Sequence, residues 1–203
     1  MIICLRKYLS FFILAVIFTY CSIQNSFAQE IDFGSYSSAY SVTLSEVNIG
    51  ENLDFGLLVQ NEGLVSVPIA DSKVLSILGV KYLDVIVDIT ADDYLLLNGN
   101  LSCSTDPSCR IPYTLQASYA NNGSNTFSEA VNFTVVSNVA SAQFPIKRRT
   151  SGPPSPPPTP VYEGYNPNLF QETAYLYIYG SLNVGNVTAG SYTSDIMVTI
   201  SYD

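Results

Sequence analysis

The sequence predicts an all-β protein built as a single antiparallel β-sandwich, and three observations favour this fold. Apolar and polar residues alternate in several short runs, as they do in half-buried strands. Tyrosine and phenylalanine, which are enriched in strands, number 15 and 10 in a chain of 203 residues. Residues typical of turns separate the runs. This length and spacing indicate one domain rather than two.

Residues 1–28 are expected to be a secretory signal peptide. Arg6 and Lys7 supply a positively charged start, an apolar run covers 9–18, and Ala28 ends a small-residue cleavage signal. The apolar run is shorter than the roughly 20 residues of a membrane-spanning helix. We therefore expect an exported chain with no membrane span after cleavage. A retained membrane anchor is the alternative.

Five later runs have the two-residue period of a strand. They are 83–90, 111–119, 131–135, 175–179 and 196–202. A short stretch at 71–78 is the one candidate for a helical turn.

A proline-rich stretch at about 147–170 interrupts the strand pattern. Lys147-Arg148-Arg149 leads into it, and proline lacks the N–H that a sheet ladder requires. The residues that follow are too few for a second sandwich. We therefore expect an inserted loop, after which the chain returns to the earlier sheet. The loop is either a ligand for a partner's aromatic groove or a solvated connection.

Cys103 and Cys109 are the cysteines that remain after signal removal, and they predict a disulfide. Asp106-Pro107 between them favours a bend that brings the two cysteines together. A redox pair is the alternative, but the spacing is not that of a C-x-x-C motif.

The composition argues against most catalytic chemistry. The chain has no histidine, which excludes histidine-based triads and histidine metal sites, and its net charge of −9 disfavours nucleic acid as a partner. The adjacent carboxylates Asp92 and Asp93 would point to opposite faces of a strand. No spacing resembles a calcium-binding loop. We expect no enzymatic activity, and no catalytic, cofactor-binding or metal-binding residues.

The end of the chain has the most specific pattern. Gly190 precedes a run in which Ile196, Val198 and Ile200 occupy alternate positions, and Tyr202 is the penultimate residue. This pattern resembles the C-terminal motif of chaperone–usher pilins.

Over residues 40–203 the chain more closely resembles the DUF4402 family of secreted bacterial pilin-like domains. The matching segments are Leu53-Asp54-Phe55-Gly56, Leu182-Asn183-Val184-Gly185 and Ala189-Gly190-Ser191-Tyr192. The proline-rich stretch followed by 174–180 resembles a version common in Bacteroidota.

The resemblance implies an immunoglobulin-like, pilin-like sandwich that lacks its last strand. The exposed edge would be the strand that follows Gly190, and a neighbour's N-terminal extension would fill the groove beside it. The candidate donor is the extension at 29–44, and the domain proper is 45–203. One face of this extension carries Tyr36, Tyr40, Val42 and Leu44.

Two points about this donor stay open in the sequence. Ile31 and Phe33 follow the opposite phase, so the register is not determined. Part of 36–44 is alternatively the first strand of the same sandwich.

The expected function is that of a non-enzymatic structural subunit of a bacterial surface appendage or extracellular matrix. Its partners would be other pilin-like subunits or a periplasmic chaperone, and its location the cell surface, a fimbria or the extracellular space. The alternative is a stand-alone secreted adhesin or carbohydrate-binding module, in which exposed tyrosines and turns such as Asn121-Asn122-Gly123 would contact glycans.

Overall fold

The computed structural model describes residues 41–149 and 170–203. These residues form twelve β-strands and three short 3-10 turns, with no α-helix among them. The 3-10 turns are Ile69–Asp71, Leu101–Ser104 and Phe127–Glu129. The all-β prediction is confirmed.

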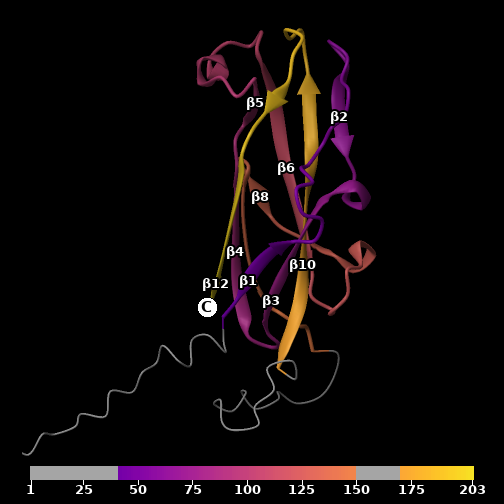
Figure 1. Cartoon of the computed structure of the whole chain (residues 1–203), viewed down its shortest axis with the longest axis vertical. Helices are drawn as coiled ribbons and strands as arrows, with labels where there is room; N and C mark the ends of the chain where they lie inside the picture. The colour runs from indigo at the N-terminus through magenta and orange to yellow at the C-terminus, as the bar shows by residue number, and fades with distance from the viewer. Residues whose placement is uncertain (1–40, 150–169) are drawn as a thin grey trace, which may run out of the picture. The chain divides into compact units, whose positions relative to one another are not determined.

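The larger sheet is antiparallel and has the order β1-β3-β10-β6-β5-β11, with β2 pairing β10 and β7 pairing β6 (Figure 1). Its strands are β1 (Thr43–Glu46), β2 (Gly63–Val67), β3 (Lys73–Val80), β5 (Tyr94–Leu97), β6 (Arg110–Ala120), β7 (Val131–Asn132), β10 (Gln171–Val184) and β11 (Tyr192–Thr193).

The smaller sheet is also antiparallel and has the order β12-β4-β9-β8. Its strands are β4 (Asp84–Ala91), β8 (Val135–Val136), β9 (Val139–Pro145) and β12 (Ile196–Tyr202). The core lies between the two sheets, which form a sandwich. Val85, Val87 and Ile89 of β4 are fully buried, and they belong to one cluster with Ile77 of β3 and Leu176 of β10.

The long strand β10 is the centre of the larger sheet. Its first part pairs with β3, its last part pairs with β2, and its other edge pairs with β6. All three partners precede the proline-rich stretch in the sequence, so the chain does return to the earlier sheet after it. Residues 150–169 of that stretch lie outside the described residues. The flanking cations make ion pairs within the chain, Lys147 with Glu172 and Arg148 with Glu129.

Two local expectations were wrong. In the stretch at 71–78 only Asp71 belongs to a 3-10 turn, and the remainder contains most of β3, because Leu75 and Ile77 point into the core and the backbone pairs with β1 and β10. The run at 131–135 is not one strand. The chain crosses from the larger sheet at β7 to the smaller sheet at β8, and buried Phe133 lies at the crossing.

The predicted disulfide between Cys103 and Cys109 is confirmed, with 5.4 Å between the two Cα atoms. It closes the connection from β5 to β6. The Asp106 carboxylate accepts a hydrogen bond from the Ser108 N–H at 2.8 Å, which fixes the turn inside the loop.

Candidate functional site

The free edge of β12 is the first component of the candidate site. Among the described strands β12 pairs with β4 alone, from Ile196 opposite Ala91 to Tyr202 opposite Val85. Its other edge meets no described strand. An unpaired edge presents backbone N–H and C=O groups that another chain can bind.

The hydrogen bonds at the two ends of this ladder show which backbone groups are unpaired. The Asp203 N–H donates to the Asp84 carbonyl at 3.2 Å, and the Asp92 N–H donates to the Asp195 carbonyl at 3.4 Å. Hydrogen-bonded and non-hydrogen-bonded pairs alternate along an antiparallel ladder. The odd-numbered residues of β12 therefore bond to β4, and the even-numbered residues direct their N–H and C=O groups to the free edge.

The same even-numbered residues turn their side chains toward the core but are only half-buried there. Ile196, Val198, Ile200 and Tyr202 are partly exposed, whereas the inward side chains of neighbouring β4 are almost completely covered. The core is therefore incompletely covered next to the unpaired backbone.

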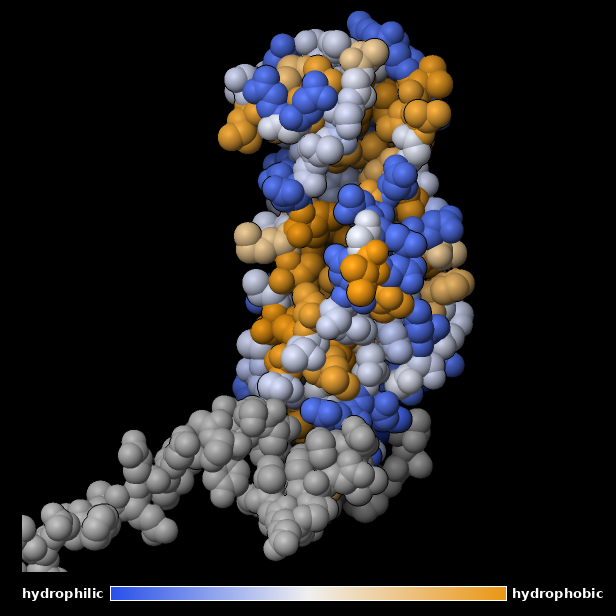
Figure 2. Space-filling view, viewed as in Figure 1, coloured by the Kyte–Doolittle hydropathy of each residue, from blue (hydrophilic) through white to orange (hydrophobic). Residues whose placement is uncertain are grey.

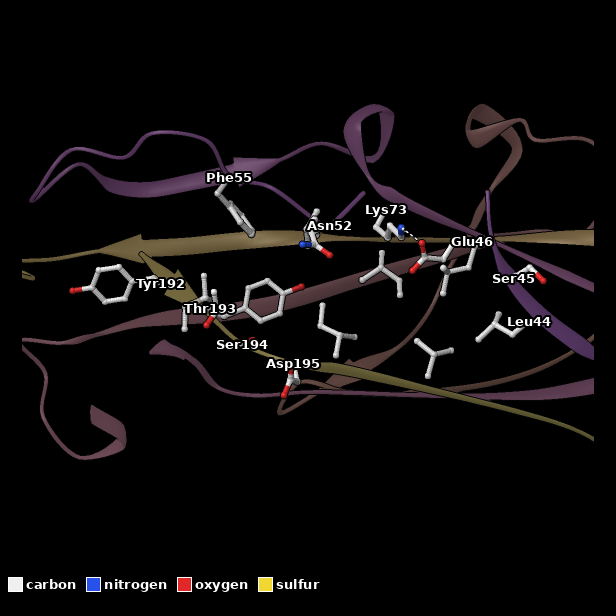
Figure 3. A pocket seen from close by; sticks show the side chains of 17 residues that line it. Leu44, Ser45, Glu46, Asn52, Phe55, Lys73, Tyr192, Thr193, Ser194 and Asp195 are labelled. Atoms are coloured by element: carbon white, nitrogen blue, oxygen red, sulfur yellow. Dashed lines mark ion pairs between the residues drawn. The ribbon is translucent and has the colours of Figure 1, made fainter. Parts of the chain in front are cut away.

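A groove of about 540 Å³ runs beside this edge. Leu44 and Glu46 of β1 form one wall, Ile196 and Val198 of β12 form the other, and the floor includes Leu75, Ile178 and Tyr113. Figure 2 shows a band of hydrophobic residues along this face of the molecule. In Figure 3, Leu44 lies at one end of the groove and Phe55 and Tyr192 lie toward the other.

Tyr202 links the two walls at the end of β12. Its hydroxyl accepts a hydrogen bond from the Val80 N–H at 2.8 Å and donates to the Ser41 carbonyl at 3.3 Å. Burial raises the pKa of the Tyr202 phenol above its ordinary value. A Cβ at Gly79 would lie 2.7 Å from this hydroxyl, so a side chain at that position would displace the Tyr202 ring or the backbone.

The structure brings most of the predicted assembly residues into this site. Ile196, Val198, Ile200 and Tyr202 form the free edge, and Gly190 lies at the turn before β11, where a Cβ would meet the Leu97 side chain.

The predicted donor residues are divided between the groove and the undescribed part of the chain. Leu44 lies in β1, paired with Ile77 of the same chain, and Val42 directly precedes that strand. Both side chains pack against this chain's own core. Tyr36 and Tyr40, like the signal peptide, lie outside the described residues.

Several groove residues were not found from the sequence. Leu75 of the floor lies in the stretch assigned to a helical turn, although Leu75 and Ile77 on either side of Ser76 have the two-residue period of a strand. Tyr113 of the floor was assigned to a strand, but nothing in the pattern showed that it faces a groove. Burial raises the pKa of the Tyr113 phenol far above its ordinary value.

Within residues 41–149 and 170–203, no group of three or more cysteine, aspartate or glutamate side chains is placed to hold a metal ion. In the same residues no helix has the length and hydropathy needed to cross a bilayer. Comparison of the whole chain with known proteins gave no match to a family model, a curated protein or a solved structure. The resemblance to the DUF4402 family therefore stays a prediction.

Proposed function

We propose that this chain is a non-enzymatic structural subunit of a bacterial surface appendage or extracellular matrix, and that it assembles by β-strand complementation. In this proposal the sandwich is pilin-like and immunoglobulin-like. A strand from a partner enters the groove between β1 and β12 and pairs with the free edge of β12.

The observation that carries the proposal is the coincidence of two deficits in the same residues. Ile196, Val198 and Ile200 have backbone groups directed to a free edge, and their apolar side chains are half-exposed beside it. One added strand corrects both deficits, because its backbone completes the ladder and its inward side chains cover the core. A small-molecule pocket needs no such run of unpaired backbone.

The occupant that we propose is the 29–40 segment of a second copy. Residues 29–40 follow the predicted cleavage site and end directly before Ser41, whose carbonyl contacts Tyr202 beside the groove. The segment contains Ile31, Phe33, Tyr36 and Tyr40, so either alternating phase supplies apolar or aromatic side chains. Export to the cell surface, and a periplasmic chaperone that covers the edge before assembly, belong to the same proposal.

The test compares the chain expressed from Gln29 with a variant that begins at Ser41. The longer chain should form a ladder of oligomers by light scattering coupled to size exclusion, and the shorter one should be monomeric. Because the shorter chain keeps its groove, it should still bind a synthetic 29–40 peptide. A peptide of the same composition in scrambled order is the matched control. A monomeric longer chain, or equal binding of both peptides, would contradict strand complementation.

A second candidate function is glycan binding, favoured by a separate depression of about 550 Å³. It includes Tyr94, Asn183 and Asn186, and the Arg110 guanidinium carbon lies 4.1 Å from the centre of the Tyr94 ring. An aromatic ring beside amide and guanidinium donors suits a sugar. Binding to a glycan panel that Tyr94→Ala abolishes would support this adhesin function, and no binding by the unaltered chain would exclude it.

A further inference from the structure

Two adjoining compartments lie along the larger sheet, and residues of β12 line only the first. The strand groove of about 540 Å³ is the first, and the second, of about 690 Å³, lies along the later part of β10 at Leu182 and Val184. Leu53 and Phe55 of the connection from β1 to β2 line both compartments, as do Leu95 and Tyr192 of the larger sheet, so these residues lie at the boundary. We call the Leu53 and Phe55 side chains the divider.

The connection that carries the divider is anchored to β3 by Lys73. The Lys73 ammonium donates to the carbonyls of Asn48 and Glu51 and pairs with the Glu46 carboxylate at 3.2 Å. The Lys73 side chain is only 13% exposed, whereas that of Glu46 is 45% exposed. Hydrogen bonds from the Gly50 N–H and Lys73 lower the pKa of Glu46.

The divider itself is held against the sheet. The Phe55 ring meets the Tyr113 ring edge-on, with 6.1 Å between centres and an interplanar angle of 82°. The Asp54 carboxylate accepts a hydrogen bond from the Gly56 N–H at 2.8 Å, and Gly56 has a φ of +73°, so the chain turns away directly after Phe55. Residues 52–58 belong to no strand. Their side chains occupy space in the groove as those of an inserted strand would, but their backbone pairs with no strand.

The free edge ends at the same level as the divider. The strand directly before β12 in the sequence is β11, which pairs with β5 of the larger sheet through Tyr192 and Thr193. Figure 3 shows Tyr192 and Phe55 toward the same end of the groove. The edge that could bind a partner therefore stops near the divider.

We propose that Leu53 and Phe55 set the length of strand that the groove accepts. The inserted strand lies against Ile196–Tyr202 and stops at the divider, and the second compartment stays unoccupied. This inference rests on the proposed function, because it specifies how much of a partner strand enters.

Hydrogen–deuterium exchange on the chain expressed from Gln29 tests the proposal, comparing assembled fractions with monomer obtained by dilution. Assembly should slow amide exchange in 196–202 by at least about tenfold and leave 187–191, which lines the second compartment and belongs to no strand, unchanged, since slowed exchange reports newly formed backbone hydrogen bonds. In Phe55→Ala the protected region should extend into 187–191. Val59→Ala is the matched control, because Val59 lies in the same connection, is 69% exposed and lines neither compartment.

The outcomes separate the two proposals. If assembly protects neither region, or no assembly occurs, strand complementation and the length limit both fail. If assembly of the unaltered chain protects 196–202 and 187–191 together, complementation stands and the length limit is wrong. A Phe55→Ala chain that assembles with an unchanged protected region also contradicts the divider. If Phe55→Ala does not fold, the protected region of the unaltered chain still tests the length limit.

Discussion

Two neighbouring proline substitutions in β12 test the orientation of its backbone. Val198 directs its N–H to the free edge, whereas the N–H of Thr199, opposite Asp88, faces β4. Val198→Pro should therefore fold, because it removes no bond to β4, and its ring should obstruct the incoming strand. Thr199→Pro should disrupt the sandwich itself.

The difference in stability can be estimated from the contacts. Val198→Pro loses part of one half-buried apolar side chain, about 1 kcal/mol of unfolding free energy. Thr199→Pro breaks a ladder bond and leaves its acceptor unpaired, about 1–3 kcal/mol, and its ring pushes against β4 as well. We expect Thr199→Pro to be the less stable of the two, by up to about 2 kcal/mol from the lost hydrogen bond and further through the clash of its ring with β4.

Urea unfolding followed by circular dichroism measures the stabilities, and size exclusion with light scattering measures assembly. Val198→Pro should be a folded monomer. If it loses as much stability as Thr199→Pro, the alternation inferred for β12 is wrong. If it is stable and still forms oligomers, the free edge of β12 is not the site of assembly.

Three further predictions concern the sandwich. Asn138 accepts a hydrogen bond from the Leu115 N–H at 2.8 Å and donates one to the Tyr113 carbonyl at 2.9 Å. Asn138→Ala should therefore leave two buried backbone groups unpaired and lower the unfolding free energy by about 3 kcal/mol in a urea titration. A loss below about 1 kcal/mol would show that water replaces the side chain. Replacing Cys103 and Cys109 by serine should lower the unfolding free energy by about 2 kcal/mol, as expected for a short closed loop. The far-ultraviolet circular dichroism spectrum should stay unchanged, and loss of the strand signal would show that the disulfide is essential to the fold. The raised pKa of Tyr113 keeps its proton bound in the folded state at a pH where the unfolded chain releases it, so stability should fall as pH rises above about 10. Tyr113→Phe should flatten that decline, and an unchanged slope would assign it to other tyrosines.

The regular strands were predictable from the sequence because their side chains alternate without interruption. The runs at 83–90, 111–119 and 196–202 correspond closely to β4, β6 and β12. β9 was not predicted, although Ser137 and Asn138 form the turn that precedes it with positive φ angles of 50° and 56°. Turns of this kind are usually recognised by glycine, and glycine is absent there.

The groove was less predictable than the strands that border it. A two-residue period shows which face of β12 is apolar, but it does not show that β12 lies at an edge, because strand pairing depends on residues far away in sequence. The divider lies in a connection without a periodic pattern. Its position depends on the anchoring of that connection by Lys73, which only the folded chain brings about.

The central position of β10 has a consequence for the order in which the chain folds. The edges of β3 and β6 that β10 joins are both present in the polypeptide before Gln171 has been synthesised. Until β10 arrives, neither edge has its native neighbour, and apolar residues such as Ile77 and Leu115 lack their cover. Because the chain is synthesised from its N-terminus, β3 and β6 are exposed to aggregation for an interval after they are made. That interval ends when β10 inserts between them.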